Sequence, residues 1–430
     1  MNQRTRMPHH PHPAAETLAQ DLLIDAEIDD EGVQHSPPPT SPRWLLVLGL
    51  VLIGINLRPA LSSLAPVLGQ IKAEIGISAT TAGLLTTLPV LCLGLFGALA
   101  PHLARRFGSE RSIAGVLLLL ALGIALRSQF GLGGLLLGSL LSGAAIGIIG
   151  VLLPGIVKRD FATQAGLMTG VYTMALCLGA ALAAGATVPL DHWLGHHWQA
   201  ALAFWSLPAL LALLVWWPQL AQRQQQHGGH WQVRGLWRDG LAWQVTVYMG
   251  LQSSLSYIVF GWMPSILIER GLSPLDAGLM MSFSIMTQVL SSLGVPLLAR
   301  HATDQRLPIA CVMTLTLAGL LGMLYAPVSQ LWLWAILLGI GQGGAFSMAL
   351  SLLVLRAPDA HVAAHLSGMA QGVGYTVAAC GPLAAGIIHD VAGNWAPVGW
   401  LFGGIATTAL CFGLLAGRRR LVKARAEQLD

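Results

Sequence analysis

The sequence predicts an all-α membrane protein with twelve transmembrane helices arranged as two six-helix bundles. Three observations predict this fold class: the composition, the number and length of the apolar segments, and the distribution of basic residues between the loops. Of the 430 residues, 54% are hydrophobic and only 10% are charged, and the mean hydropathy is +0.66. This composition fits a membrane protein with many spans better than any soluble class.

Twelve apolar segments are long enough to cross a hydrocarbon layer ~30 Å thick, which takes about 20 helical residues. They are expected at 44–68, 79–102, 111–128, 130–157, 163–188 and 199–217, and again at 240–268, 274–299, 307–326, 331–355, 362–388 and 397–416. The chain should therefore comprise a disordered, proline-rich cytoplasmic tail (1–43), a first bundle (44–217), a cytoplasmic linker (218–239), a second bundle (240–416) and a basic cytoplasmic tail (417–430).

Basic residues divide unevenly between the two sides of the predicted membrane. With the N-terminus inside, 19 of the 23 Lys and Arg residues fall on the cytoplasmic side, and three, Lys72, Arg127 and Arg270, fall outside. Cytoplasmic loops of helical membrane proteins are enriched in Lys and Arg. The distribution supports the twelve segments and predicts that both termini are cytoplasmic.

The remaining basic residue, Arg58, lies in the middle of the first apolar segment. A charge at the bilayer centre costs at least ~2.5 kcal/mol on insertion scales, and no carboxylate is expected at this depth to offset it. We predict that a solute or ion from outside the chain supplies the counter-charge. Two alternatives stay open: the side chain reaches a lipid headgroup, or carbonyls and amides of neighbouring helices satisfy it.

Pro59 should break the first helix beside this arginine. Proline donates no backbone hydrogen bond, clashes with the carbonyl of Ile55 and disfavours a helical conformation in the residue before it. A break would let Asn56 and Arg58, which point to different sides of a straight helix, face one cavity. Irregular backbone at this depth is tolerated only where protein or water covers it.

The seventh and eleventh segments carry uncharged polar residues at similar depth. Gln252, Ser253 and Tyr257 lie near the middle of the seventh segment, and Gln371 and Tyr375 share a face of the eleventh. As a set facing one cavity, these groups would orient a small polar ligand. Each one alone could equally join two helices.

The two halves show traces of an internal duplication. The residues "PHLAR" at 101–105 match "PLLAR" at 296–300, an offset of 195 residues, and the same offset places the start of the first segment on the start of the seventh. Two repeats with polar residues at corresponding depth indicate a site between them, as in transporters that rock one bundle against the other.

The span from about 44 to 416 resembles the major facilitator superfamily, and specifically its cyanate-permease and nitroimidazole-transporter branch. The residues that carry the resemblance are "NLRP" in the first segment, "APHLARRFG" after the second, "QSSLSY" and "WMP" in the seventh and "GMAQGVGY" in the eleventh. The resemblance implies two pseudo-symmetric bundles, transport of small molecules across the bacterial inner membrane, and a cavity lined mainly by the first, fourth, seventh and tenth helices. Such a cavity would include Arg58 and Gln252.

The loop after the second segment departs from the pattern of the superfamily. An Asp followed by Arg is usual there, whereas this chain has Arg105 before Arg106 and Gly108. The acidic residue of a latch between the bundles is therefore missing. The cytoplasmic side could instead be closed by contacts of Arg105, Arg106 and Arg300 with carbonyls at helix ends. Alternatively, these three residues only keep their loops on the cytoplasmic side of the membrane.

Together these features predict a secondary transporter that moves a small polar or anionic solute, a cyanate-like anion or a planar nitro-heterocycle, by alternating access. A guanidinium stays charged and presents a planar fork that suits such solutes. Aromatic side chains that include Trp262 could stack on the solute or serve only for packing. A broad drug or metabolite exporter and a membrane sensor that does not transport are the alternatives. The direction and the coupling ion stay open.

We expect no enzymatic activity, because the sequence shows no HExxH pair, nucleophile elbow or phosphate-binding glycine loop. No cofactor and no metal are predicted, since the histidine-rich stretches lack a complete ligand set. The expected partners are the small-molecule solute and the lipid bilayer. No nucleic acid is expected, and we predict a monomer.

Overall fold

The computed structural model describes residues 43–161, 165–221, 231–299, 302 and 304–428. Within these ranges, twelve helical segments are long and apolar enough to cross a membrane, as the hydropathy pattern predicted. The N-terminal tail up to residue 42 lies outside the described residues, so its disorder stays a prediction.

The first span consists of four short pieces rather than one helix. They are α2 (Arg43–Asn56), α3 (Pro59–Ser62), the 3₁₀ turn η1 (Ala65–Val67) and α4 (Leu68–Ile75). A proline stands at the first or second position of both α3 and η1, where its missing N–H costs no helical hydrogen bond. The break leaves Arg58 between α2 and α3, where its carbonyl accepts backbone hydrogens from the next turn.

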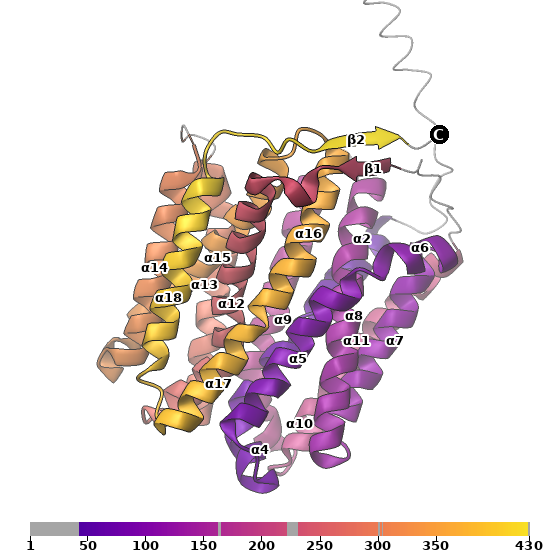
Figure 1. The fold of residues 1–430 in the computed structure, drawn as a ribbon. Coiled ribbons are helices and arrows are strands. Elements are labelled where there is room, and N and C mark those ends of the chain that lie inside the picture. Colours follow the sequence, from indigo (N-terminus) through magenta and orange to yellow (C-terminus); the bar gives the residue numbers. More distant parts are fainter. Residues whose placement is uncertain (1–42, 162–164, 222–230, 300–301, 303, 429–430) are drawn as a thin grey trace, which may run out of the picture. The chain divides into compact units, whose positions relative to one another are not determined.

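The other eleven spans are more regular, although two are interrupted (Figure 1). A short helix, α6 (Ala100–Phe107), joins the second span to the third. The spans are α5 (Ala79–Gly97), α7 (Ser109–Leu126), α8 (Gly131–Asp160), α9 (Ala165–Trp193), α10 (Trp198–Phe204) with α11 (Ser206–Trp216), α12 (Gly240–Glu269), α13 (Pro274–Ala299), α14 (Arg306–Tyr325), α15 (Leu331–Leu355), α16 (Ala360–Ala378) with α17 (Cys380–Ala392), and α18 (Val398–Ala416).

The helices of the two halves pack in the same pattern. In the first half α8 packs against α5 and α7, α2 packs against α9 and α11, and α11 also contacts α7. In the second half α15 packs against α13 and α14, α12 packs against α16 and α18, and α18 also contacts α14. Each of these contacts has a counterpart in the other half. This is the arrangement of two pseudo-symmetric six-helix bundles, and it agrees with the offset of 195 residues in the sequence.

Glycines allow the closest of these contacts. A Cβ atom on Gly147 of α8 would lie 2.4 Å from the carbonyl oxygen of Leu93 in α5. In the second half, a Cβ atom on Gly343 of α15 would lie 2.3 Å from the carbonyl oxygen of Gln288 in α13. No side chain fits at such a distance, so small residues set the helix spacing at corresponding places in both halves.

The two halves meet mainly along two pairs of spans, since α16 and α17 belong to one span. α9 of the first half packs against α13 of the second, and α5 packs against both α16 and α17. Between α9 and α13 the approach is again close, because a Cβ on Gly278 would lie 2.5 Å from the carbonyl oxygen of Ala184. The site described below lies where these halves face each other.

A small sheet joins the segment before α12 to the C-terminal tail, a pairing that the sequence pattern did not predict. β1 (Trp231–Arg234) pairs antiparallel with β2 (Arg425–Gln428) (Figure 1). Nearby, the carboxylate of Asp239, which caps α12, accepts the backbone hydrogen of Lys423 at 2.9 Å. Parts of the predicted linker and basic tail therefore fold against each other.

Candidate functional site

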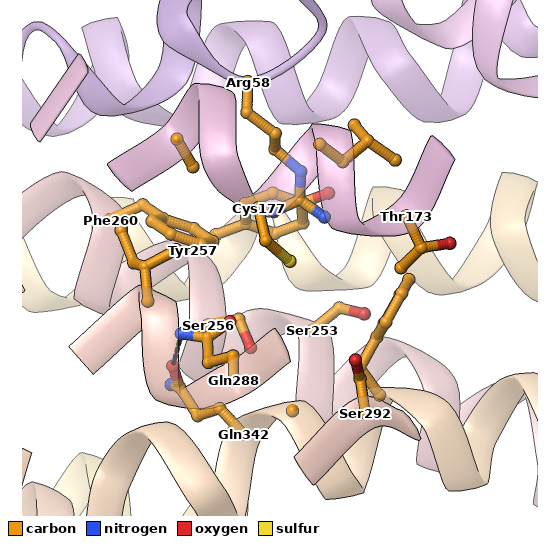
Figure 2. Close-up of a pocket in the computed structure, with 15 residues that line it drawn as sticks. Arg58, Thr173, Cys177, Ser253, Ser256, Tyr257, Phe260, Gln288, Ser292 and Gln342 are labelled. Atoms are coloured by element: carbon orange, nitrogen blue, oxygen red, sulfur yellow. Dashed lines mark hydrogen bonds between the residues drawn. The ribbon is translucent and has the colours of Figure 1, made fainter. Parts of the chain in front are cut away.

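A cavity lies between the two halves near the middle of the spans (Figure 2). Its walls come from the break between α2 and α3, and from α9, α12, α13 and α15. The empty space is about 620 Å³ when the part open to solvent is included. The resemblance implied walls mainly from the first, fourth, seventh and tenth helices. The fifth span (α9) and the eighth span (α13) line the cavity as well, whereas no described residue of the fourth span, α8, is in the lining. Its polar lining consists of Arg58, Thr173, Ser253, Ser256, Gln288, Ser292 and Gln342.

Arg58 extends from the helix break into this cavity (Figure 2). Its Cζ atom lies 5.3 Å from the ring centre of Phe260 in α12, within the range of a cation–π interaction. The guanidinium has no hydrogen bond or ion pair with any residue that the structure describes, and the lining includes no Asp, Glu, Lys or His. The positive charge therefore faces the cavity without a counter-charge from the described residues.

Two arginines that are buried, unlike the half-buried Arg58, show what a structural arginine does in this protein. Arg127, which follows α7, donates to the carbonyl oxygen of Ala60 in α3 at 2.7 Å, and burial lowers its pKa to about 10. Arg356, which follows α15, donates to the carbonyl oxygen of Ala416 at the end of α18 at 2.8 Å. Both guanidinium groups donate to a carbonyl oxygen of a neighbouring helix, whereas that of Arg58 donates to no residue that the structure describes.

Tyr257 and Phe260 of α12 form an aromatic wall beside Arg58. The ring of Tyr257 meets the ring of Tyr375 in α16 edge to face, with the centroids 6.1 Å apart. Tyr375, predicted to bind the solute, is outside the lining and supports Tyr257. An aromatic face next to a guanidinium suits a planar solute.

Gln288 of α13 and Gln342 of α15 form a polar wall across the cavity from Arg58 (Figure 2). The Nε2 atom of Gln288 donates to Oε1 of Gln342 at 3.3 Å. The sequence pattern did not point to either residue, since single amides in apolar segments are common between helices. The spacing of Gln288 and Ser292, four residues apart on one helix face, was the available signal.

Two residues predicted to bind the solute hold helices together instead. Asn56 is buried, and its Nδ2 atom donates to the carbonyl oxygens of Leu52 at 2.7 Å and of Pro208 in α11 at 3.0 Å. Trp262 is also buried and donates from Nε1 to the carbonyl oxygen of Pro382 in α17 at 2.7 Å. Neither is in the cavity lining, because hydrogen bonds turn both toward neighbouring helices.

Gln252 and Gln371 also lie outside the lining. Gln252 is buried and donates to the hydroxyl of the adjacent Ser253 at 2.8 Å, and Gln371 donates to the hydroxyl of Ser367 in its own helix at 2.8 Å. These bonds within one helix occupy the NH₂ groups of the two amides, while Oε1 of Gln252 has no partner among the described residues. The predicted binding residues that do line the cavity are Arg58, Ser253 and Tyr257.

The structure describes three of the four residues predicted for the cytoplasmic gate. Arg105 and Arg106 are exposed on α6, and the Cζ atom of Arg106 lies 5.3 Å from the ring centre of Phe107. Gly108 directly precedes α7 as its N-cap residue and has a φ of +87°, a conformation that favours glycine. Arg300 lies outside the described residues, and the gate stays a prediction.

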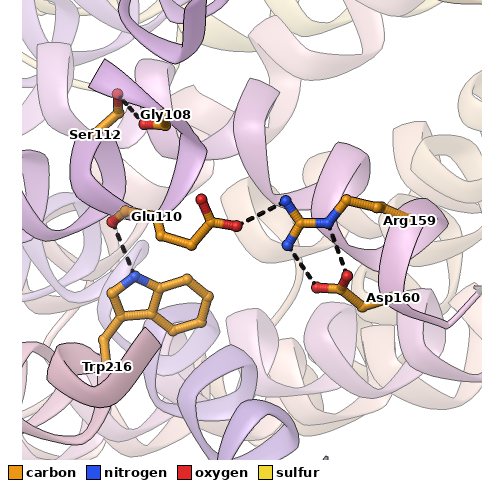
Figure 3. A network of polar contacts seen from close by, with 6 residues as sticks. All are labelled: Gly108, Glu110, Ser112, Arg159, Asp160 and Trp216. Atoms are coloured by element: carbon orange, nitrogen blue, oxygen red, sulfur yellow. Dashed lines mark hydrogen bonds and ion pairs between the residues drawn. The ribbon is translucent and has the colours of Figure 1, made fainter. Parts of the chain in front are cut away.

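A buried acidic residue, Glu110, follows this loop in the first turn of α7 (Figure 3). Its carboxylate forms an ion pair with Arg159 near the end of α8, with 2.7 Å between Oε1 and Nη1, and Arg159 also binds Asp160. Burial lowers the pKa of Arg159, but the two carboxylates outweigh it and raise the pKa above its usual range. Trp216 of α11 donates to the Glu110 carbonyl at 3.1 Å, so the network joins α7, α8 and α11.

One group of residues in the described chain could hold a metal ion. Ligand atoms of Asp191, His192 and His196, at the end of α9, lie within 4.8 Å of one another. The Asp191 carboxylate already accepts a hydrogen bond from Gln70 at 3.2 Å and lies 3.7 Å from Nδ1 of His196. These contacts satisfy the carboxylate in part, and the absence of a metal stays a prediction.

The chain is similar to known transporters over most of its length. The sequence profile of the Major Facilitator Superfamily matches residues 45–377. A 2-nitroimidazole transporter of Escherichia coli (strain K12) is 39% identical over 389 residues, which cover 89% of this chain and 97% of that protein. The cyanate transport protein CynX of the same organism is 34% identical over 391 residues, or 89% and 99% of the two chains.

Solved structures share the fold at low sequence identity. The nucleoside transporter NupG superposes with a TM-score of 0.67 at 15% identity and covers 86% of this chain and 98% of its own. A D-xylose-proton symporter superposes with a TM-score of 0.66, also at 15% identity, and covers 87% of this chain and 95% of its own.

Proposed function

The chain belongs to the major facilitator superfamily and is a secondary transporter, and we propose that it carries a small polar or anionic solute by alternating access, with Arg58 as the principal anchor. The proposed solutes are a cyanate-like anion or a planar nitro-heterocycle. These are the solute classes in the names of the two relatives described above.

The guanidinium of Arg58 is the observation that carries this proposal. It lines a cavity at mid-span, and no described residue offers it a carboxylate or a carbonyl oxygen. A charge at this depth of the membrane without a partner is costly, and ionisable groups inside membrane spans mark solute pathways. An anion or a nitro group would provide oxygen acceptors for the planar fork of the guanidinium.

The position of the cavity supports alternating access. Arg58 and α9 belong to the first half, whereas α12, α13 and α15 belong to the second. A solute bound there touches both bundles, so rocking one bundle against the other would expose it to one side of the membrane and then to the other.

Uptake into proteoliposomes tests the proposal. The purified full-length chain is reconstituted, and accumulation of labelled 2-nitroimidazole and of labelled cyanate is measured for the wild type and for Arg58→Gln. We expect vesicles with the wild type to accumulate at least one of the two solutes and vesicles with Arg58→Gln to accumulate neither. Both proteins should elute from a size-exclusion column as a single folded species. Uptake by Arg58→Gln at the wild-type rate would show that Arg58 is not the anchor.

The same assay separates the two alternatives. A sensor binds the solute, which a thermal-shift measurement detects, but accumulates no label inside the vesicles. A broad exporter of neutral drugs would move those drugs equally well with and without the Arg58 charge, because a neutral apolar drug gains little from a guanidinium.

The orientation and the assembly are part of the proposal. Basic residues cluster on the side where α2 begins and α18 ends, which supports cytoplasmic termini in a bacterial inner membrane. We expect the transporter to act as a monomer and without enzymatic activity. A reporter fused after Asp430 would fluoresce only if the C-terminus is cytoplasmic, and light scattering of the detergent complex would give its mass.

A further inference from the structure

We propose that the solute is held by two donors, the guanidinium of Arg58 on one wall of the cavity and the side-chain NH₂ group of Gln342 on the other. Its chemical class is then a planar molecule with two separate hydrogen-bond acceptors, one for each donor. This inference rests on the proposed function, because it assigns a second contact in the same cavity.

Gln342 carries an unused donor in the wall of the cavity. Its side chain is only 2% exposed, it belongs to the lining, and its Nε2 atom has no hydrogen-bond partner among the described residues. A buried N–H group without an acceptor costs free energy, and an acceptor on a bound solute removes that cost. The guanidinium of Arg58, which is half-buried, also has no hydrogen-bond partner among the described residues, on the opposite side (Figure 2).

Gln288 fixes which end of the Gln342 amide is free. The amide hydrogen of Gln288 occupies Oε1 of Gln342 at 3.3 Å, so the Nε2 group is the one that is left for a ligand. The two helices that carry this pair cannot separate easily, because Gly343 packs directly on the backbone of Gln288. The donor is therefore positioned before the solute arrives, which lowers the cost of binding.

The lining then selects the solute by its chemistry. It includes no Asp, Glu, Lys or His among the described residues, so the cavity offers one cation and no anion. Tyr257 and Phe260 provide flat apolar contact for a ring. A ring with a nitro group and an unprotonated ring nitrogen has acceptors for both Arg58 and Gln342.

Two ligands that differ in one acceptor test the second contact. 2-Nitroimidazole has a nitro group and an acceptor nitrogen in the ring, and 2-nitropyrrole keeps the nitro group but lacks that nitrogen. Affinities of the purified full-length protein for both are measured by calorimetry. We expect the wild type to bind 2-nitroimidazole about fivefold to tenfold more tightly, the effect of one hydrogen bond. Gln342→Leu should bind both equally, and Gln342→Met is the substitute if the leucine variant does not fold.

Gln219→Leu is the matched control. Gln219 is a buried amide, 1% exposed, in the 3₁₀ turn after α11 and outside the cavity lining, so the same substitution there should keep the preference for 2-nitroimidazole. If the Gln342 variants keep the full preference for 2-nitroimidazole, the proposed contact with Gln342 is overturned. If Arg58→Gln binds both ligands as the wild type does, the proposed function fails instead, so the two failures are distinguishable.

Discussion

The carboxylate of Asp390 accepts the backbone hydrogen of Thr80 at 2.6 Å and the hydroxyl hydrogen of the same residue at 2.5 Å, across 310 residues of sequence. Its other oxygen accepts the backbone hydrogen of Ala79 at 2.9 Å. Asp390 lies near the end of α17, and Ala79 begins α5. A carboxylate from the second half therefore caps a helix of the first half, where the free N–H groups and the helix dipole favour an anion.

We expect Asp390→Asn to loosen the contact between the halves at the α4 end of the spans. An amide is a weaker acceptor than a carboxylate and places an NH₂ group against one of the donors. The measurement is the rate at which a thiol reagent reaches Cys177, a cavity residue, with Cys92, Cys311, Cys380 and Cys411 replaced. Loss of a helix cap is worth ~1 kcal/mol, which corresponds to a roughly fivefold faster reaction.

Asp359→Asn is the control for this prediction. The Asp359 carboxylate caps α16 of its own half by accepting the Val362 backbone hydrogen at 2.8 Å, and that bond does not join the halves. Its substitution should leave the labelling rate of Cys177 unchanged. Equal acceleration in both variants would mean that general loosening of helix ends, and not a contact between the halves, controls access.

The bounds of the spans could be predicted well because a span takes about 20 apolar residues, so the hydropathy averaged over that length depends little on any single residue. The eighth span was predicted at 274–299 and is Pro274–Ala299, and the seventh was predicted at 240–268 and is Gly240–Glu269. Arg58 could be singled out for the same reason, since one charge in an apolar run needs no structural knowledge to be noticed.

The rest of the site could not be predicted because hydropathy does not determine how each helix is rotated about its axis. Asn56 and Arg58 are two residues apart, yet one bonds to α11 and the other faces the cavity. Gln252 and Gln342 are similar in type and depth, yet only Gln342 lines the cavity. Packing of whole helices, which involves residues far apart in the sequence, decides such differences.

Arg58→Lys should bind the solute at least tenfold more weakly than the wild type. Lysine keeps the charge but lacks the planar fork that makes two parallel hydrogen bonds, and it changes the cation–π contact of the guanidinium with Phe260. Calorimetric titration with 2-nitroimidazole measures the change. The exposed Arg111→Lys is the control and should bind as the wild type does. Wild-type affinity of Arg58→Lys would show that charge alone suffices.

Glu110→Gln should lower the stability of the folded protein by about 1–3 kcal/mol. Glu110 is 3% exposed, and its carboxylate pairs with Arg159. The substitution removes this negative charge, so Asp160 becomes the one carboxylate partner of Arg159 among the described residues. The expected loss is below the ~3–5 kcal/mol of a fully buried pair because Arg159 is partly exposed. Thermal unfolding in detergent gives the shift in Tm. Asp304→Asn, which removes an exposed ion pair with Arg306, should change Tm little, and equal shifts would contradict this assignment.

Asn56→Leu should destabilise the protein without weakening solute binding. The Asn56 amide donates to the carbonyl oxygens of Leu52 and Pro208, so its loss removes a link between α2 and α11 and leaves the Pro208 carbonyl without this donor. One such loss costs about 1 kcal/mol, which thermal unfolding detects. Because Asn56 is outside the cavity lining, the affinity for 2-nitroimidazole should stay within about twofold of wild type, a change of less than 0.5 kcal/mol. A tenfold loss of affinity with an unchanged Tm would place Asn56 in the binding site, as the sequence alone suggested.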